Sequence, residues 1–394
     1  MAPAEENIFQ MTFRSAPEVL SSAPGRINLI GEHTDYNNGY VLPAAIHLRT
    51  FFLAAARPDH RVRVQAENFG EEETFDLTAI VPSPDKRWAN YIKGIFWVLQ
   101  QAGHKLGGLN ALIRGDVPLE SGLSSSAALE VSVIKGVCAL QGINLPDLEM
   151  ARLAQRAENE FVGVKCGLMD QFISVFGRKD SALFLDCETL DYSYHSLNLV
   201  KAGLVVLVYD TKVPRRLAAS EYNTRRQESG RALEVLKRKG VRSFKEATTA
   251  LLDTCREEMG PVPFRRARHV ITENGRVRSA VEALQKDDFQ ALGKLLFHSH
   301  ESLRDDHEVS CPELDLLYEA GRDFPGCLGA RLVGAGFGGS GIALIEKTAG
   351  QEFRTKLLAE ARKRGFPGPE FYEVAIGRGA EVSRVARSSG PGSD

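Results

Sequence analysis

"DVPLESGLSSSAALEVSVIKG", residues 116–136, runs from the end of a β-type segment through a turn of glycine and serine into a helix. The residues before the turn, ALIRGDV at 111–117, have the character of a strand, and apolar residues recur at helical spacing after it. Such a helix begins with unpaired backbone N–H groups, and its dipole favours an anion there. The hydroxyls from Ser124 to Ser126 can cap the helix or contact a phosphate and Mg²⁺, and this stretch alone leaves both interpretations open.

Strand and helix patterns follow one another in blocks on both sides of this stretch. Strand-like runs occupy 41–57, 111–117, 181–187 and 203–210 and flank a glycine cluster at 334–341. Helical spacing occupies 88–98, 125–140, 147–162 and 167–177, and then 216–239, 262–285 and 287–304. Strands open the chain, and long charged helices with a few strands fill its second half. This order predicts an α+β fold rather than strictly alternating βαβ units.

The length of the chain predicts two lobes. Its 394 residues exceed the ~250–300 that one hydrophobic core usually serves. We place the boundary near residue 200, so that residues 1–200 form the first lobe and 201–386 the second. The last residues, RSSGPGSD at 387–394, are small and polar, and we expect a disordered tail.

Composition and charge limit the classes of partner. A hydrophobic content of 43%, a charged content of 25% and a net charge of −2 are ordinary for a globular protein and do not favour nucleic acid or an anionic membrane. We find no signal-peptide pattern at the start and no apolar run of about 18 residues. Six scattered cysteines without a CxxC pair argue against a zinc cage or a disulfide framework. These features predict a cytoplasmic protein with a small-molecule ligand.

A second glycine-rich stretch, GARLVGAGFGGSGIALIEK at 329–347, formally contains the dinucleotide fingerprint GxGxxG. That fingerprint has to open a helix, whereas the residues that follow here, SGIALIE, are β-type. An NAD-binding fold is therefore rejected. A hairpin that needs glycine for positive φ angles remains the simple alternative. Together with the serine turn, this loop indicates a nucleotide ligand.

The third stretch, PGRINLIGEHTDYNNG at 24–39, concentrates polar residues between two turn signals. Pro24-Gly25 and the Asn-Asn-Gly at its end predict a loop from Arg26 to Tyr36, held between strands. The loop offers hydrogen-bonding groups suited to the hydroxyls of a sugar or polyol: Glu32, His33 and Asp35. A metal site and a solvated polar turn are the two alternatives.

These three stretches, in this order, resemble the signature motifs of the galactokinase family within the GHMP small-molecule kinases. KCGLMDQF at 165–172 and SEYNTRRQE at 220–228 also resemble segments of this family, and the resemblance extends from about residue 18 to 380. GEHTDY is the specific motif, because the glycine motifs alone reach only the superfamily.

The resemblance implies ATP- and Mg²⁺-dependent phosphorylation of the anomeric C1 hydroxyl of galactose to galactose 1-phosphate, the first step of galactose breakdown. It implies a GHMP kinase fold: an N-terminal lobe like ribosomal protein S5 domain 2, a ferredoxin-like C-terminal lobe, and the active site in the cleft between them. We expect a monomer that binds galactose and MgATP, and the sequence leaves an oligomer open.

Motif matching also implies roles for single residues. The catalytic pair is Asp170 and Arg26. The residues implied for the sugar are Glu32, His33, Asp35, Gly167, Asp170 and Tyr222. Those implied for ATP are Trp88, Tyr91, Gly122, Leu123, Ser124, Ser125, Ser126 and Ala127, and those for Mg²⁺ are Ser126 and Glu158. A carboxylate within reach of the hydroxyl can take its proton, and an arginine can neutralise the transferring phosphoryl group. The sequence leaves open whether Asp170 removes the proton or orients the hydroxyl.

One position departs from the family pattern. The family's second motif begins with a glycine-rich turn, whereas this chain has Leu119, Glu120 and Ser121 before the glycine. A carboxylate pointing at ATP phosphates would cost about 1 kcal/mol even at a dielectric near that of water. We therefore expect Glu120 to point away from the phosphates.

Three other functions compete with this interpretation. An N-acetylgalactosamine kinase would use the same chemistry, whereas mevalonate and homoserine kinases have no loop like GEHTDY. A catalytically silent regulator that binds galactose and ATP would be expected to lack parts of the machinery. The presence of Asp170, Arg26 and the serine run argues against it.

Overall fold

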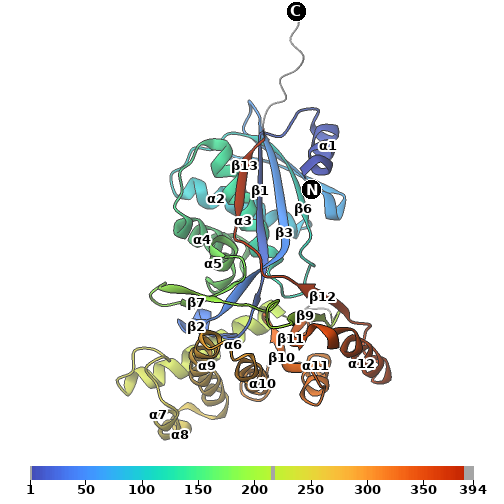
Figure 1. Ribbon diagram of the computed structural model, residues 1–394. Coiled ribbons are helices and arrows are strands. Elements are labelled where there is room, and N and C mark those ends of the chain that lie inside the picture. Colours follow the sequence, from blue (N-terminus) through green and yellow to red (C-terminus); the bar gives the residue numbers. More distant parts are fainter. Residues whose placement is uncertain (1, 214–217, 386–394) are drawn as a thin grey trace, which may run out of the picture.

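The computed structural model describes residues 2–213 and 218–385, and its strands form three sheets (Figure 1). The first sheet has the spatial order β13 (Glu381–Arg384), β1 (Val19–Asn28), β3 (Pro43–Ala56), β6 (Leu109–Gly115), β4 (Arg61–Ala66) and β5 (Glu71–Asp76). The second has the order β10 (Cys327–Val333), β11 (Ser340–Glu346), β9 (Leu204–Asp210) and β12 (Glu370–Val374). The third joins β2 (Tyr40–Val41), β7 (Ser181–Asp186) and β8 (Tyr192–Ser196). Among the described strands only β4 and β6 pair in parallel, so the predicted α+β class is confirmed.

Helices cover the sheets in two groups. The first half contains α1 (Ala2–Phe13), α2 (Arg87–Gln101), α3 (Ser125–Gln141), α4 (Asp147–Arg156), a π-helical turn η3 (Ala157–Val162) and α5 (Met169–Phe176). The second half contains α6 (Ala218–Arg238), α7 (Thr249–Thr254), α8 (Arg256–Met259), α9 (Pro261–Gln285), α10 (Phe289–Asp305), α11 (Pro312–Arg322) and α12 (Gly350–Lys363). Short 3₁₀ turns are η1 (Asp35–Asn37), η2 (Glu67–Phe69) and η4 (Lys347–Ala349). Every helix predicted from apolar spacing is present. No helix among the described residues is long and apolar enough to cross a membrane.

The hydrophobic cores show how the halves are joined. One core lies between the first sheet and helices α2 to α5, with Phe52, Val131 and Phe172 fully or almost fully buried in it. A second core packs the ends of β1 and β3 against β9, β11 and the helices α9 and α10. The first and second halves of the chain therefore share apolar contacts, which fixes the pocket between them. The division near residue 200 stays a prediction.

Two features differ from the expected arrangement. Helix α1 precedes the first strand and packs its buried Phe9 against β3 and β6, so strands do not open the chain. Pro24-Gly25 does not end a strand, since β1 continues through it to Asn28. A register shift between Pro24 and Arg26 absorbs the proline, which has no N–H to give to the ladder. Arg26 therefore lies on a strand and not in a loop.

The C-terminal part of the chain is described up to residue 385. Strand β13 returns to the first sheet, where Arg384 pairs with Val19 of β1. The predicted tail at 387–394 lies outside the described residues.

Candidate active site

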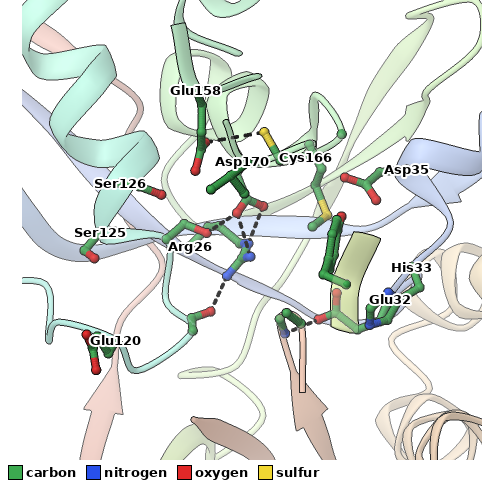
Figure 2. A pocket seen from close by; sticks show the side chains of 18 of the residues that line it. Arg26, Glu32, His33, Asp35, Glu120, Ser125, Ser126, Glu158, Cys166 and Asp170 are labelled. Atoms are coloured by element: carbon green, nitrogen blue, oxygen red, sulfur yellow. Dashed lines mark hydrogen bonds and ion pairs between the residues drawn. The ribbon is translucent and has the colours of Figure 1, made fainter. Parts of the chain in front are cut away.

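One pocket of about 360 Å³ collects most of the residues singled out in the sequence (Figure 2). The predicted residues that line it are Arg26, Glu32, His33, Asp35, Tyr91, Gly122, Ser124, Ser125, Ser126, Glu158, Gly167, Asp170 and Tyr222. In Figure 2, Arg26 and Asp170 lie between Ser125 and Ser126 on one side and the Glu32–Asp35 loop on the other. The pocket thus has a serine side and a loop side with an ion pair between them.

The ion pair joins β1 to the first turn of α5. Arg26 donates from Nε to Oδ1 of Asp170 and from Nη2 to Oδ2, both at 2.8 Å. Its third contact is from Nη1 to the carbonyl of Gly122 at 2.5 Å. Arg26 is 4% exposed. Two parallel bonds hold the carboxylate in one orientation, as fork-to-fork pairs do.

Ser124 stands at the N-cap of α3, but its hydroxyl does not cap the helix. Its φ angle is 60°, and its Oγ donates to Oδ2 of Asp170. Of the two interpretations left open for this hydroxyl, helix capping is therefore excluded for Ser124. The N-cap side chain makes no capping hydrogen bond, and Ser125 and Ser126 in the first turn of α3 line the pocket. An uncapped helix start facing a pocket suits an anionic group.

Glu32 on the loop side is also paired with a buried arginine. Its Oε1 accepts a hydrogen bond from the backbone N–H of Gly334 at 2.8 Å and lies 3.2 Å from Nη2 of Arg331. Arg331 is completely buried on β10. The glycine cluster after β10 forms a hairpin with β11, as its rejection as a dinucleotide fingerprint predicted, and it anchors the Glu32 side chain.

Asp35 sits against Gly167 at the entry to α5. A Cβ atom on Gly167 would lie 2.0 Å from Oδ2 of Asp35, so only glycine allows this approach. Burial, together with the nearby charge of Asp170, raises the pKa of Asp35 to about 7. In the described part of the chain no ion pair to Asp35 is formed, so its carboxyl can serve a bound hydroxyl as acceptor or donor, depending on pH.

A pair of buried carboxyl groups lies beyond Asp170. Nε2 of Gln171 donates to Oε2 of Glu158 at 2.7 Å and to Oε2 of Glu130 at 3.0 Å. Neither carboxyl has a lysine or arginine partner within the described residues. Burial and the charge of Asp170 raise the pKa of Glu158 to about 7, and burial and Glu158 raise that of Glu130 well above its ordinary value.

This carboxyl pair bears on the predicted Mg²⁺. No group of three or more His, Cys, Asp or Glu residues within the described ranges forms a metal cluster. Mg²⁺ commonly binds one or two protein carboxylates and takes its other oxygens from water and substrate phosphates. Glu158 has no lysine or arginine partner within the described residues, and it lines the pocket together with Ser126. These oxygen donors fit Mg²⁺.

Three predicted residues do not line this pocket. Trp88 stacks on Phe69 with ring centroids 6.1 Å apart and donates from Nε1 to Glu71. Leu123 and Ala127 are fully buried, and the Leu123 carbonyl accepts the backbone N–H of Arg26 at 2.9 Å. These two residues shape the turn rather than face the cavity.

Six lining residues were not predicted as site residues: Glu120, Val164, Cys166, Met169, Gly334 and Ala335. Glu120 is exposed and is one of the lining residues, and its expected orientation away from the phosphates stays a prediction. Cys166 and Met169 flank the predicted Gly167 in one motif, and that adjacency was an available signal. Nothing in the sequence pattern indicated the contact between Arg331 and Glu32.

Comparison with known protein families gives three matches along the chain. Residues 7–56 match the galactokinase galactose-binding signature, residues 90–178 the N-terminal domain of GHMP kinases, and residues 280–363 the GHMP kinase C-terminal domain. The galactokinase of Roseiflexus sp. (strain RS-1) is 43% identical over 387 residues, which cover 98% of this chain and 95% of that protein. The galactokinase of Thermococcus kodakarensis is 42% identical, over 91% of this chain and 99% of that protein.

Solved structures show the same similarity. Lactococcus lactis galactokinase, crystallised with galactose, superimposes with a TM-score of 0.91 at 38% identity, covering 96% of this chain and 98% of that one. Methanococcus jannaschii mevalonate kinase superimposes with a TM-score of 0.65 at 19% identity, over 93% of this chain and all of that one. The second similarity concerns the fold alone.

Proposed function

The chain belongs to the galactokinase family of GHMP kinases, enzymes that phosphorylate galactose with ATP, and we propose that Asp170 and Arg26 carry this transfer here. The predicted GHMP kinase fold is confirmed by the relatives and by the N- and C-terminal domain matches. The activity is the transfer of the γ-phosphoryl group of ATP to the C1 hydroxyl of galactose, giving galactose 1-phosphate and ADP. N-acetylgalactosamine kinase, the predicted alternative, is not favoured.

The observation that carries the proposed roles is the position of the Arg26–Asp170 pair between two different kinds of lining. The sugar hydroxyl would approach Asp170 from the loop side, and the carboxylate would orient it and accept its proton. Arg26 holds that carboxylate with two hydrogen bonds of 2.8 Å, so its orientation is set before substrate binds. The Ser124 hydroxyl, bonded to the same carboxylate, adds a third restraint.

We assign the serine side to the ATP phosphates. The uncapped start of α3 and the hydroxyls of Ser125 and Ser126 provide donors for phosphate oxygens. Ser126 and Glu158 would hold Mg²⁺, which when bound neutralises charge on the phosphates. Tyr91 and Trp88 remain our predicted adenine contacts. Only Tyr91 lines this pocket.

We assign the loop side to galactose. Glu32, His33 and Asp35 supply acceptors and a donor, and Tyr222 of α6 closes the pocket beside the His33 ring at 5.4 Å. The two carboxylates differ in their partners. Glu32 forms an ion pair with Arg331, whereas Asp35 forms no ion pair within the described residues. We further propose a cytoplasmic enzyme that works as a monomer.

A coupled assay of ADP release over a panel of sugars tests the proposal. We expect turnover with galactose and little with N-acetylgalactosamine or glucose. Turnover of another sugar in place of galactose would refute the substrate assignment. Tight galactose and ATP binding by calorimetry without turnover would instead identify a silent binding protein.

A further inference from the structure

The Tyr36 hydroxyl lies between two histidine rings at the edge of the pocket. It is 2.9 Å from Nδ1 of His33 and 3.2 Å from Nε2 of His307. The two rings face each other with centroids 4.5 Å apart. His33 and Tyr36 belong to the loop after β1, whereas His307 follows α10 in the second half. The three residues therefore connect the two halves of the chain beside the pocket.

His33, Tyr36 and His307 have three polar side-chain hydrogens between them when both histidines are neutral. Burial is the main cause that lowers the pKa of His33, to about 3, and that of His307 well below its ordinary value. Both rings are therefore neutral at physiological pH, and each carries one N–H. The Tyr36 hydroxyl has one hydrogen, so it donates to one ring and accepts from the other. Only two arrangements satisfy both contacts.

The two arrangements differ at Nε2 of His33, the ring nitrogen that Tyr36 does not contact. Nε2 of His33 is buried and makes no hydrogen bond within the described residues, although its ring lines the cavity. If Tyr36 donates to Nδ1 of His33, then Nε2 carries the hydrogen. If Tyr36 accepts from Nδ1, then Nε2 is a bare acceptor. The second arrangement would place the hydrogen of His307 on its Nδ1, which is also buried and makes no hydrogen bond within the described residues. A buried N–H without a partner is costly, whereas the Nε2–H of His33 belongs to a ring that lines the pocket and can be met by a ligand, so the arrangement with hydrogen on Nε2 of His33 is favoured.

We propose that Tyr36 and His307 fix the tautomer of His33, so that its Nε2–H donates a hydrogen bond to one hydroxyl oxygen of the bound sugar. His307 donates from Nε2 to Tyr36, and Tyr36 donates to Nδ1 of His33. Tyr36 and His307 are positioning residues, because they act through His33. The inference rests on the proposed use of this pocket for galactose.

The surroundings hold this relay in place. Arg225 of α6 donates to the carbonyl of His307 at 2.8 Å. The Tyr36 ring packs edge-on against Tyr222 with centroids 5.1 Å apart. A phenylalanine at position 36 keeps that packing and loses only the hydroxyl, so Tyr36→Phe is a clean test.

Deoxy and deoxyfluoro galactoses, altered at carbons 2, 3, 4 and 6, distinguish a donor from an acceptor in the protein. Fluorine can accept a hydrogen bond weakly and cannot donate one. If His33 donates, one ring position should show kcat/KM about tenfold higher for the fluoro than for the deoxy sugar, the factor given by about 1.4 kcal/mol. Tyr36→Phe should bring this ratio close to one and raise the galactose KM about tenfold, with a smaller change in kcat. Equal losses for fluoro and deoxy sugars at every position, or an unchanged ratio in Tyr36→Phe, would overturn the proposal.

A second readout does not depend on phosphorylation. The ¹⁵N shifts of the His33 ring, assigned with His33→Gln, should show hydrogen on Nε2 in the wild type and a mixture of tautomers in Tyr36→Phe. His307→Gln keeps an N–H that can reach Tyr36 and should retain the wild-type pattern, whereas His307→Phe should resemble Tyr36→Phe. Tyr194→Phe, which loses a hydroxyl bonded to the Phe176 carbonyl on another face, serves as the matched control. Hydrogen on Nδ1 of His33 in the wild type would overturn the tautomer assignment, even if galactose is the substrate.

Discussion

Asp170 and Glu158 are carboxylates of the same pocket, but within the described residues only Asp170 has a cationic side chain as its partner. Arg26 holds Asp170 with two hydrogen bonds of 2.8 Å, whereas Glu158 is held by the amide of Gln171 at 2.7 Å. The charge of a carboxylate paired inside the protein is already balanced, so it suits a neutral ligand such as a sugar hydroxyl. The charge of a buried carboxylate without a cationic partner is not balanced, so it suits a ligand that supplies a cation, such as Mg²⁺.

The same contrast divides the loop side. Glu32 has Arg331 within 3.2 Å, and Asp35 has no ion pair in the described part of the chain. Apart from the exposed Glu120, the pocket therefore holds two carboxylates with a cationic partner, Asp170 and Glu32, and two without one among the described residues, Glu158 and Asp35. The contrast predicts which substitutions reduce stability and which increase it.

Removing the compensated carboxylate at the reaction centre should have the largest effect. Asp170→Asn keeps the shape but cannot accept the proton of the C1 hydroxyl, so we expect kcat to fall by roughly 10²–10⁴. The KM for ATP should change little, because the serine side is untouched. Steady-state kinetics with both substrates measure this, and an unchanged kcat would remove Asp170 from the mechanism.

Removing the uncompensated carboxylate on the serine side should affect the metal. We expect Glu158→Gln to raise the Mg²⁺ concentration for half-maximal activity at least about tenfold, as lost support at metal sites does. Without Mg²⁺ the variant should be at least as stable as the wild type, since no buried cation loses its partner.

Titration with Mg²⁺, followed by thermal unfolding and by activity, measures both effects. Glu160→Gln is the matched control. Glu160 lies two positions after Glu158 and forms an exposed ion pair with Arg156. Equal Mg²⁺ dependence in Glu158→Gln and the control would show that Glu158 does not support the metal.

Removing the compensated carboxylate on the loop side should lower stability. Glu32→Gln leaves the fully buried Arg331 without its anion, and breaking such a pair costs about 3–5 kcal/mol. The galactose KM should rise while the ATP KM stays near its wild-type value. Urea titration measures the free energy of unfolding of Glu32→Gln and of its control, Glu319→Gln. The control breaks an exposed ion pair with Arg364 and should lower that free energy by less than about 1 kcal/mol. A rise in ATP KM instead would mean that the loop is assigned to the wrong substrate.

The smallest effect concerns pH. The pKa of Asp35 is about 7 in the folded protein against 3.8 ordinarily, so its stabilising contribution is present below pH 4 and is lost as pH rises through 7. Asparagine mimics the protonated form, and Asp35→Asn should be more stable than the wild type at pH 8. The full shift corresponds to about 4 kcal/mol at about 1.4 kcal/mol per pKa unit, and we expect roughly 1–3 kcal/mol because solvent screens part of it at this partly exposed residue. The difference should shrink towards pH 4. A constant difference between pH 4 and 8, measured by urea unfolding, would contradict the raised pKa.

Local patterns in the sequence predicted most of the helices and strands. Apolar spacing identified α2, α3 and α9, because buried apolar residues recur along the length of each helix. The course of β1 through Pro24 was not predictable in this way. Whether a proline ends a strand or sits at a register shift depends on the neighbouring strand, here β3.

The candidate site was predicted from motifs, and its internal pairing was not. Resemblance identified Asp170, Arg26 and the loop residues, and the structure brings them to one pocket. The pairing of Glu32 with Arg331 joins residues about three hundred positions apart, which no local spacing reveals. The Ser124 hydroxyl likewise turns to Asp170 because of the left-handed backbone at that residue, which a serine run does not indicate.

Strand β13 has a consequence for how the protein is made. It pairs with Val19–Ser22 of the ten-residue β1. The last described strand is therefore the edge strand beside the first one. During synthesis on a ribosome the outer edge of β1 remains unpaired until residues 381–384 have emerged. Pairings between such distant residues also form slowly. The nascent first half is therefore a template with an unpaired edge, and chaperone protection of that edge would matter until residues 381–384 have emerged.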